Sequence, residues 1–239
     1  MKRISIEEMK RIQIEILKDV HLFCERNNIR YTLIYGSLLG AVRHKGYIPW
    51  DDDIDIYMPR DDYERFLQLY YDEAGTYRVL NPRTEPHYYY TFAKVVDVRT
   101  KMMEKETAGY EIGVYMDIFP VDYVTDDLQK RQRIFRLKHL LYKIRRCKIS
   151  ATNPLRSQWA YRCYRHLPVP LMVLNRLIEC LVVRKRPTAT VCNMTEAGPK
   201  LKGCFPAADI EGDVDILFEG KHYKTMSGYH DYLQKTYGD

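Results

Sequence analysis

Apolar residues recur at helical spacing near the start of the chain. The positions that lie three or four residues apart are Met9, Ile12, Ile16, Val20 and Phe23. Such residues fall on one face of a helix, so this segment predicts an amphipathic helix with one buried side. Ser5 is a residue type that begins helices, and the acids Glu7 and Glu8 follow it. We expect this first helix to run up to Asn27–Asn28.

A period of two replaces the helical period after the turn at Gly46–Pro49. The residues that alternate between polar and apolar are Asp53, Ile54, Asp55, Ile56, Tyr57 and Met58. This alternation predicts a half-buried strand, because successive side chains of a strand point to opposite faces. The polar face of this strand would carry Asp53 and Asp55.

Further elements follow from short aromatic and β-branched runs and from helical periodicity. The other strands expected are Tyr31–Tyr35, Tyr77–Leu80, Thr91–Val98, Gly113–Phe119 and Asp213–Phe218. The helices expected are Leu38–Arg43, Tyr63–Tyr71 capped by Asp61, Leu128–Lys148, one or two helices over Ser157–Arg184 broken near Pro168 and Pro170, and His230–Tyr237. Because strands and helices mix without strict alternation, we expect an α+β fold with a mixed β-sheet and flanking helices.

Composition indicates a globular protein of the cytoplasm. The 239 residues are 46% hydrophobic and 13% aromatic, enough apolar surface to build one sizeable core. The N-terminus is charged and lacks a secretory apolar stretch, and no apolar run reaches the roughly 20 residues of a membrane span. The six cysteines form no C-x-x-C pair, so neither a disulfide framework nor a zinc site is indicated.

Positive charge is concentrated in one segment. Residues 127–187 hold 16 of the 38 Lys and Arg residues but only two of the 32 acids. We interpret this segment as a basic helical insertion between a catalytic core, residues 1–126, and a C-terminal segment, residues 188–239, that completes the catalytic domain. Such asymmetry indicates an anionic partner, either a phospholipid surface or a phosphorylated substrate.

The first basic helix has the pattern of a membrane-surface helix. Its apolar residues are Leu137, Leu140, Leu141 and Ile144, and Lys138, Arg145 and Arg146 are expected on other faces. Each Lys or Arg near an anionic membrane contributes about 1 kcal/mol, so the helix predicts a peripheral contact with the inner face of a membrane. The alternative is a solvated basic face over a helical subdomain.

Three aspartates are the candidates for chemistry. Asp53 and Asp55 are two residues apart on one predicted strand, which places both carboxylates on one face about 7 Å apart. Asp117 lies on another predicted strand between apolar neighbours, where an unpaired charge is costly. Hard oxygen ligands suit Mg²⁺ or Mn²⁺, and a bound metal would explain the position of Asp117. The alternative for Asp51–Asp53 is an ordinary solvated loop.

Gly36–Ser37 and two basic residues complete the predicted site. A small, flexible turn lets backbone N–H groups and a hydroxyl approach phosphate oxygens, and Arg43 and Lys94 are candidate counter-charges. Two metal ions held by three carboxylates can clamp a diphosphate and polarise the attacked phosphorus. The combination predicts a site for phosphoryl transfer, with metal on the aspartates and substrate on Gly36, Ser37, Arg43 and Lys94.

One long run extends from Tyr35 to Ile56 and reads YGSLLGAVRHKGYIPWDDDIDI. It resembles the signature of the LicD family, which comprises phosphotransferases such as bacterial phosphorylcholine transferases and has fukutin-type proteins as distant relatives. Further similar stretches are Phe92–Val95, Met116–Asp122 and Gly228–Asp239. The resemblance covers most of Tyr31–Asp239 and implies a nucleotidyltransferase-like fold.

The resemblance also implies an activity. Members of this family transfer a phospho-substituent, phosphocholine or a phospho-alditol, from a CDP-activated alcohol donor to a glycan hydroxyl and release CMP. The acceptor would be a cell-surface glycan such as lipopolysaccharide or teichoic acid, or its lipid-linked precursor. Asp53 and Asp55 match the metal pair of the family, Asp117 matches its third carboxylate, the base and a shared metal ligand, and Lys94 matches a lysine that faces phosphate.

Other functions remain open at this point. The same three aspartates would suit a nucleotidyltransferase that adds NMP to a small molecule, and the basic helices would suit a non-catalytic binding module. No nucleic-acid partner is expected, because the bases are not interleaved with exposed aromatics and no groove-reading motif is present. If choline is transferred, Tyr88–Tyr90 could surround its ammonium, although aromatic residues in a strand core explain this run as well.

Overall fold

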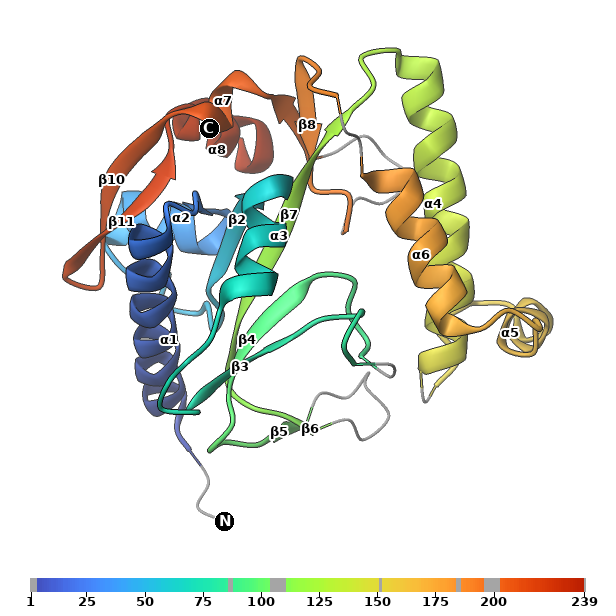
Figure 1. Cartoon of the computed structure of the whole chain (residues 1–239), viewed down its shortest axis with the longest axis horizontal. Helices are drawn as coiled ribbons and strands as arrows, with labels where there is room; N and C mark the ends of the chain where they lie inside the picture. Colours follow the sequence, from blue (N-terminus) through green and yellow to red (C-terminus); the bar gives the residue numbers. More distant parts are fainter. Residues whose placement is uncertain are drawn as a thin grey trace.

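The computed structural model has an α+β fold around a mixed sheet (Figure 1). It describes residues 4–85, 88–103, 111–150, 152–183, 186–195 and 203–238. The sheet order is β1-β2-β7-β4-β3, formed by β1 (Thr32–Leu33), β2 (Asp55–Pro59), β7 (Tyr115–Val124), β4 (Ala93–Asp97) and β3 (Tyr77–Leu80). β2 and β7 run parallel, whereas the other neighbours are antiparallel. The predicted mixed sheet is confirmed.

β7 is the central strand and is longer than predicted. It continues through Pro120 to Val124, because its last residues, Asp122–Val124, pair with β8 (Thr190–Cys192), which in turn pairs with β9 (Cys204–Pro206). Two separate hairpins join β10 (Asp213–Phe218) to β11 (Lys221–Met226) and β5 (Met102–Met103) to β6 (Glu111–Ile112). The sequence pattern predicted β10 but not β11, whose lysines obscure any alternation, nor β5, β6, β8 and β9, because two or three residues show no period.

The first helix forms as predicted. α1 spans Ile6–Asn27, and the Ser5 hydroxyl accepts a hydrogen bond from the Glu8 backbone N–H at 3.2 Å. Asn28 ends the helix in the left-handed region, with φ of 49°. α3 (Arg60–Leu69) differs from the prediction, because Pro59 occupies the N-cap position and Asp61 lies inside the first turn without capping it. A proline is tolerated there since its missing N–H has no helical partner to lose.

The structure corrects the predicted strand at Tyr31–Tyr35. Only Thr32 and Leu33 pair with β2, and α2 (Tyr35–His44) begins almost at once. Gly36 and Ser37 therefore lie in the first turn of a helix instead of a turn after a strand. Tyr35 adopts φ of 47°, a costly conformation for a residue with a side chain, and its hydroxyl lies 2.5 Å from that of Tyr57.

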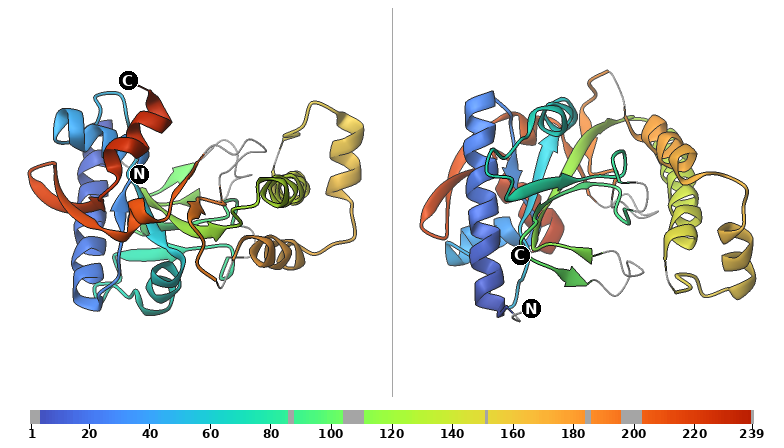
Figure 2. Two further views of the ribbon diagram at one scale, coloured as in Figure 1. Left: turned by 90° about the horizontal axis from the view of Figure 1, so that it is seen from above. Right: turned by 60° about the horizontal axis from the view of Figure 1, so that its bottom comes forward.

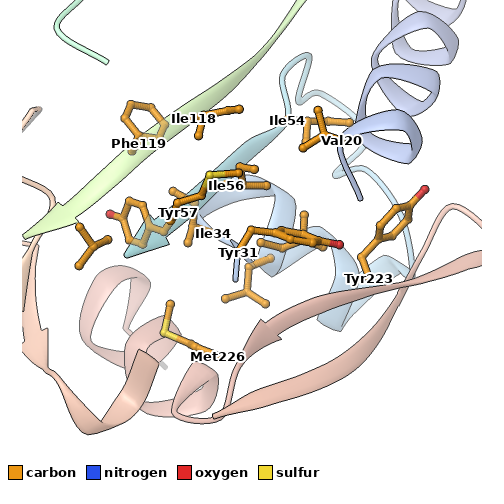
Figure 3. Close-up of a cluster of buried hydrophobic side chains, with 14 of the residues drawn as sticks. Val20, Tyr31, Ile34, Ile54, Ile56, Tyr57, Ile118, Phe119, Tyr223 and Met226 are labelled. Atoms are coloured by element: carbon orange, nitrogen blue, oxygen red, sulfur yellow. The ribbon is translucent and has the colours of Figure 1, made fainter. Parts of the chain in front are cut away.

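One core joins the sheet to the N-terminal and C-terminal segments. Figure 3 shows Ile56 of β2 and Ile118 of β7 in one cluster with Val20 of α1 and the side chains of Tyr223 and Met226 from β11. α7 (Ala208–Glu211) and α8 (Tyr229–Tyr237) follow on the same side as α2. The segment after β9 thus packs on the strands that carry the predicted site.

Three helices stand beside the sheet in Figures 1 and 2: α4 (Leu128–Ile149), α5 (Gln158–Arg165) and α6 (Leu171–Val182). α5 and α6 are separated at Pro168 and Pro170, as predicted. Within the described ranges, no helix has both the length and the apolar character needed to cross a membrane.

The structure buries two of the basic residues of α4 that were expected to face an anionic surface. Lys138 and Arg145 are 0% and 2% exposed, whereas Leu137 and Leu140 are 46% and 41% exposed. The reason is that α4 packs against loop backbone as well as apolar side chains. Buried carbonyls there need hydrogen-bond donors, and the two basic residues supply them: Lys138 Nζ donates to the Met194 carbonyl at 2.8 Å.

Candidate active site

Two predicted acids and the predicted lysine form one row across three strands. Asp55 of β2 lies opposite Asp117 of β7, and Asp117 lies opposite Lys94 of β4. Residues in register on neighbouring strands point to the same face of a sheet, so the three side chains share one face. Lys94 Nζ lies 2.6 Å from Asp117 Oδ1, which makes a buried ion pair in the middle of the row.

Aromatic rings surround the ammonium group of Lys94. Its Nζ is 3.3 Å from the ring centroid of Tyr115 and 4.2 Å from that of Tyr90, and the side chain is 1% exposed. The cation is therefore stabilised by one carboxylate and by the faces of two tyrosine rings. Such a desolvated pair holds both side chains in place, since separating the charges would leave each one buried.

Asp53 lies beside this row and next to Asp51. It precedes β2 instead of belonging to it, which corrects the predicted strand start. Burial first, and then the neighbouring carboxylates of Asp51, Asp117 and Asp52, together raise the pKa of Asp53 to about 7. Several carboxylates are thus packed closely enough to repel one another, and a proton or a cation must offset that repulsion.

Carboxylate oxygens of Asp51, Asp52 and Asp53 all lie within 4.8 Å of one another. Hard oxygen donors at this spacing fit Mg²⁺ or Mn²⁺, and a divalent cation would offset the repulsion between these carboxylates that helps to raise the pKa of Asp53. Asp51 was not predicted as a site residue, because an Asp-rich run is also typical of a loop. The repetition of three acids was the available signal.

Gly36 and Ser37 hold the acid-bearing segment close to α2. A Cβ atom on Gly36 would lie 2.0 Å from Asp51 Oδ2, so only glycine permits this approach. The first turn of a helix favours a carboxylate, because its N–H groups carry partial positive charge. The buried Ser37 hydroxyl accepts a hydrogen bond from the Asp55 N–H at 2.9 Å. Contact of either residue with a phosphate stays a prediction.

Arg43 does not join this group. It lies exposed near the other end of α2 and lines a cavity of about 290 Å³ with His230 and Tyr237 of α8. Burial first, and then the charges of Asp55, Asp51 and Asp53, raise the pKa of Tyr237 to about 12. The periodicity of α8 gave no indication of this position.

A pocket of about 470 Å³, here called the α4 pocket, opens beside the ion pair. Its lining includes Tyr89, Tyr90, Lys94, Asp117, Lys143 and Arg146. Of the predicted tyrosine run, Tyr88 belongs to a buried cluster with Leu80, Val96 and Ile112, whereas Tyr89 and Tyr90 line the pocket. Binding of a choline ammonium by this run stays a prediction.

The part of the chain that matches a known protein family contains the predicted site residues. The family model described as LicD/FKTN/FKRP, nucleotidyltransferase domain, matches residues 28–157, a range that contains all seven predicted site residues. The lipopolysaccharide cholinephosphotransferase LicD of Haemophilus influenzae is 30% identical over 255 residues, which cover 100% of this chain and 92% of that protein. Ribitol 5-phosphate transferase FKRP of Homo sapiens is 46% identical over 99 residues, 41% of this chain and 15% of that protein.

Proposed function

Because the chain belongs to the LicD family, we propose that it is a metal-dependent phosphotransferase that moves phosphocholine or a phospho-alditol from a CDP-activated alcohol to a glycan hydroxyl. The acceptor would be a cell-surface glycan or its lipid-linked precursor, and CMP would leave. The observation that carries the proposal is the row of Asp55, Asp117 and Lys94 with Asp53 packed beside it. Such clustered carboxylates suit divalent cations.

The residues of this row have separable tasks in the proposed reaction. Asp53 and Asp55 would hold Mg²⁺ or Mn²⁺, which when bound neutralises the diphosphate and polarises the attacked phosphorus. Asp117 would accept the proton of the acceptor hydroxyl as its oxygen forms a bond to phosphorus. The bond between that phosphorus and the bridging oxygen of CMP breaks, and CMP takes the electron pair. Lys94 orients the Asp117 carboxylate through the 2.6 Å ion pair.

The identity of the small product tests this proposal. The protein is incubated with Mg²⁺, a lipopolysaccharide or teichoic acid acceptor, and one of four donors: CDP-choline, CDP-ribitol, CDP-glycerol or CTP. We expect CMP to form from one of the CDP-alcohols. Product analysis by anion-exchange chromatography separates CMP from pyrophosphate. Pyrophosphate formed from CTP would instead identify a nucleotidyltransferase, and loss of CDP-alcohol without label on the acceptor would contradict glycan transfer.

We also propose that α5 and α6 contact the cytoplasmic face of a membrane. The exposed residues considered for this contact are Trp159 and Arg162 of α5 and Met172, Val173, Arg176 and Leu177 of α6. Trp159 and Met172 are 78% and 64% exposed. Exposure of this apolar surface to water is unfavourable, and insertion at a lipid interface would remove it from water. Arg162 and Arg176 would contact anionic headgroups, each contributing about 1 kcal/mol.

Trp159 fluorescence tests this membrane contact. In a Trp50→Phe variant Trp159 is the single tryptophan of the chain, and its emission is expected to shift to the blue with anionic phosphatidylserine vesicles at low salt. Arg162→Gln with Arg176→Gln should weaken binding tenfold or more, by about 1 kcal/mol for each charge removed. The matched pair Arg11→Gln with Arg26→Gln, exposed on α1, should have no effect. No shift, or an equal shift with neutral vesicles, contradicts the proposal.

A further inference from the structure

The α4 pocket has one wall that carries uncompensated positive charge. Lys143 and Arg146 both line it from α4, and no described carboxylate lies within ion-pair distance of either. Asp117 is the single acid among the described lining residues, and it is already paired with Lys94. The charges of Lys143, Lys138 and Arg146, after burial, also lower the pKa of His139 on the same wall. A ligand that complements this wall is anionic.

Two buried cations make the pocket a rigid feature. The Arg145 guanidinium donates to the carbonyls of Tyr88 at 2.5 Å and Tyr90 at 3.1 Å, to the carbonyl of Tyr89, and to Asn175 Oδ1 at 2.7 Å. It thereby fixes the tyrosine wall against α4. Lys138 holds the opposite loop at Met194. Arg146 Nε in turn donates to the Tyr89 hydroxyl at 3.1 Å, which ties two residues that line the pocket to each other. Preformed walls lower the cost of binding.

The position of the pocket favours the acceptor over the donor. The sheet order places β2, with the acids held by α2, on one side of Asp117, and it places β4 and the α4 pocket on the other side. Attacking and leaving oxygens lie on opposite sides of phosphorus in phosphoryl transfer. If the donor diphosphate lies beside Asp53 and Asp55, the acceptor hydroxyl must reach Asp117 from the α4 side.

The size and lining of the pocket suit a saccharide. A volume of about 470 Å³ falls in the range of small-molecule sites and accommodates one or two sugar rings. The rings of Tyr89 and Tyr90 can lie against the apolar face of a sugar, and their hydroxyls can hydrogen-bond to it.

Resting on the proposed function, we propose that the α4 pocket binds the acceptor saccharide through an anionic substituent, a phosphate or carboxylate group, held by Lys143 and Arg146. Charge-assisted hydrogen bonds from an ammonium and a planar guanidinium match either group. The acceptor of this protein is therefore a charged glycan instead of a neutral one. Lys143 and Arg146 would be determinants of acceptor specificity.

Binding of small sugars to the full chain tests the proposal. With the donor side filled by Mg²⁺ and CMP, glucose 6-phosphate and glucuronic acid are titrated by calorimetry against methyl glucoside. We expect one or both charged sugars to bind at least tenfold more tightly than the neutral one, and which of them does so distinguishes phosphate from carboxylate. Lys143→Gln with Arg146→Gln should weaken this binding at least tenfold, and CMP affinity should stay unchanged.

Arg133→Gln with Arg136→Gln is the matched control, because it removes the same charge from exposed positions of the same helix outside the pocket. Equal binding of methyl glucoside, or equal weakening by both pairs of substitutions, overturns the proposal. An equal loss of CMP affinity in the Lys143 and Arg146 variant assigns the pocket to the donor and also overturns it. If the Lys143 and Arg146 variant transfers from a CDP-alcohol with an unaltered acceptor KM, this subsite alone is refuted. If the unsubstituted protein binds the charged sugars but transfers nothing from any CDP-alcohol, the proposed function is refuted.

Discussion

Asp53→Asn and Asp55→Asn are each expected to lower turnover by about 10²-fold or more while the fold persists. Each substitution removes a carboxylate that would bind the cation and leaves a side chain of nearly equal volume. Asp53 lies among Asp51, Asp117 and Asp52, whose charges help to raise its pKa to about 7, so its loss relieves repulsion instead of creating a cavity. Thermal stability without metal should therefore be retained or raised in the Asp53 variant.

Turnover is followed as CMP release at saturating Mg²⁺, and metal affinity as Mn²⁺ binding by calorimetry. Both should fall together in the two variants. Asp61→Asn is the control, because Asp61 is an exposed aspartate in the first turn of α3, outside the row. Near-normal turnover with unchanged Mn²⁺ affinity in either active-site variant would remove these residues from the metal site.

Lys94→Met is expected to destabilise the protein by about 3–5 kcal/mol, the usual cost of leaving one buried charge without its partner. Lys94 is 1% exposed and lies 2.6 Å from Asp117, so its replacement removes the cation that this carboxylate pairs with. The double variant Lys94→Met with Asp117→Leu should regain much of this loss, because no unpaired charge remains. Neither variant is expected to transfer a phospho-substituent.

Urea unfolding measures both free energies. The exposed pair Lys101–Glu111, at 2.7 Å, supplies the matched control, and Lys101→Met should cost less than about 1 kcal/mol because water screens that pair. Equal effects at Lys94 and Lys101 would show that the buried pair does not anchor the row. A double variant no more stable than Lys94→Met would show that packing, not the unpaired charge, causes the loss.

Local patterns determined the elements that carry the site and two of its acids. The helical period from Met9 to Phe23 and the alternation after Asp53 depend only on which side of an element is apolar, and α1 and β2 follow them. Spacing alone predicted Asp53 and Asp55 on one strand, whereas the structure has Asp55 in β2 and Asp53 just before it. The long resemblance between Tyr35 and Ile56 indicated the family, which the match over residues 28–157 confirms.

Only the tertiary structure decided how these parts meet. Strand order and register, which set Asp55, Asp117 and Lys94 in one row, depend on segments far apart in sequence. The approach of Asp51 to Gly36 depends on how a loop returns to α2. Periodicity also treated the basic residues of α4 as solvent-facing. Arg145 is buried instead, because the carbonyls of the Tyr88–Tyr90 loop need hydrogen-bond donors and its guanidinium supplies them. A sequence pattern reports the polarity of its own element, but the neighbours of that element determine which face is buried.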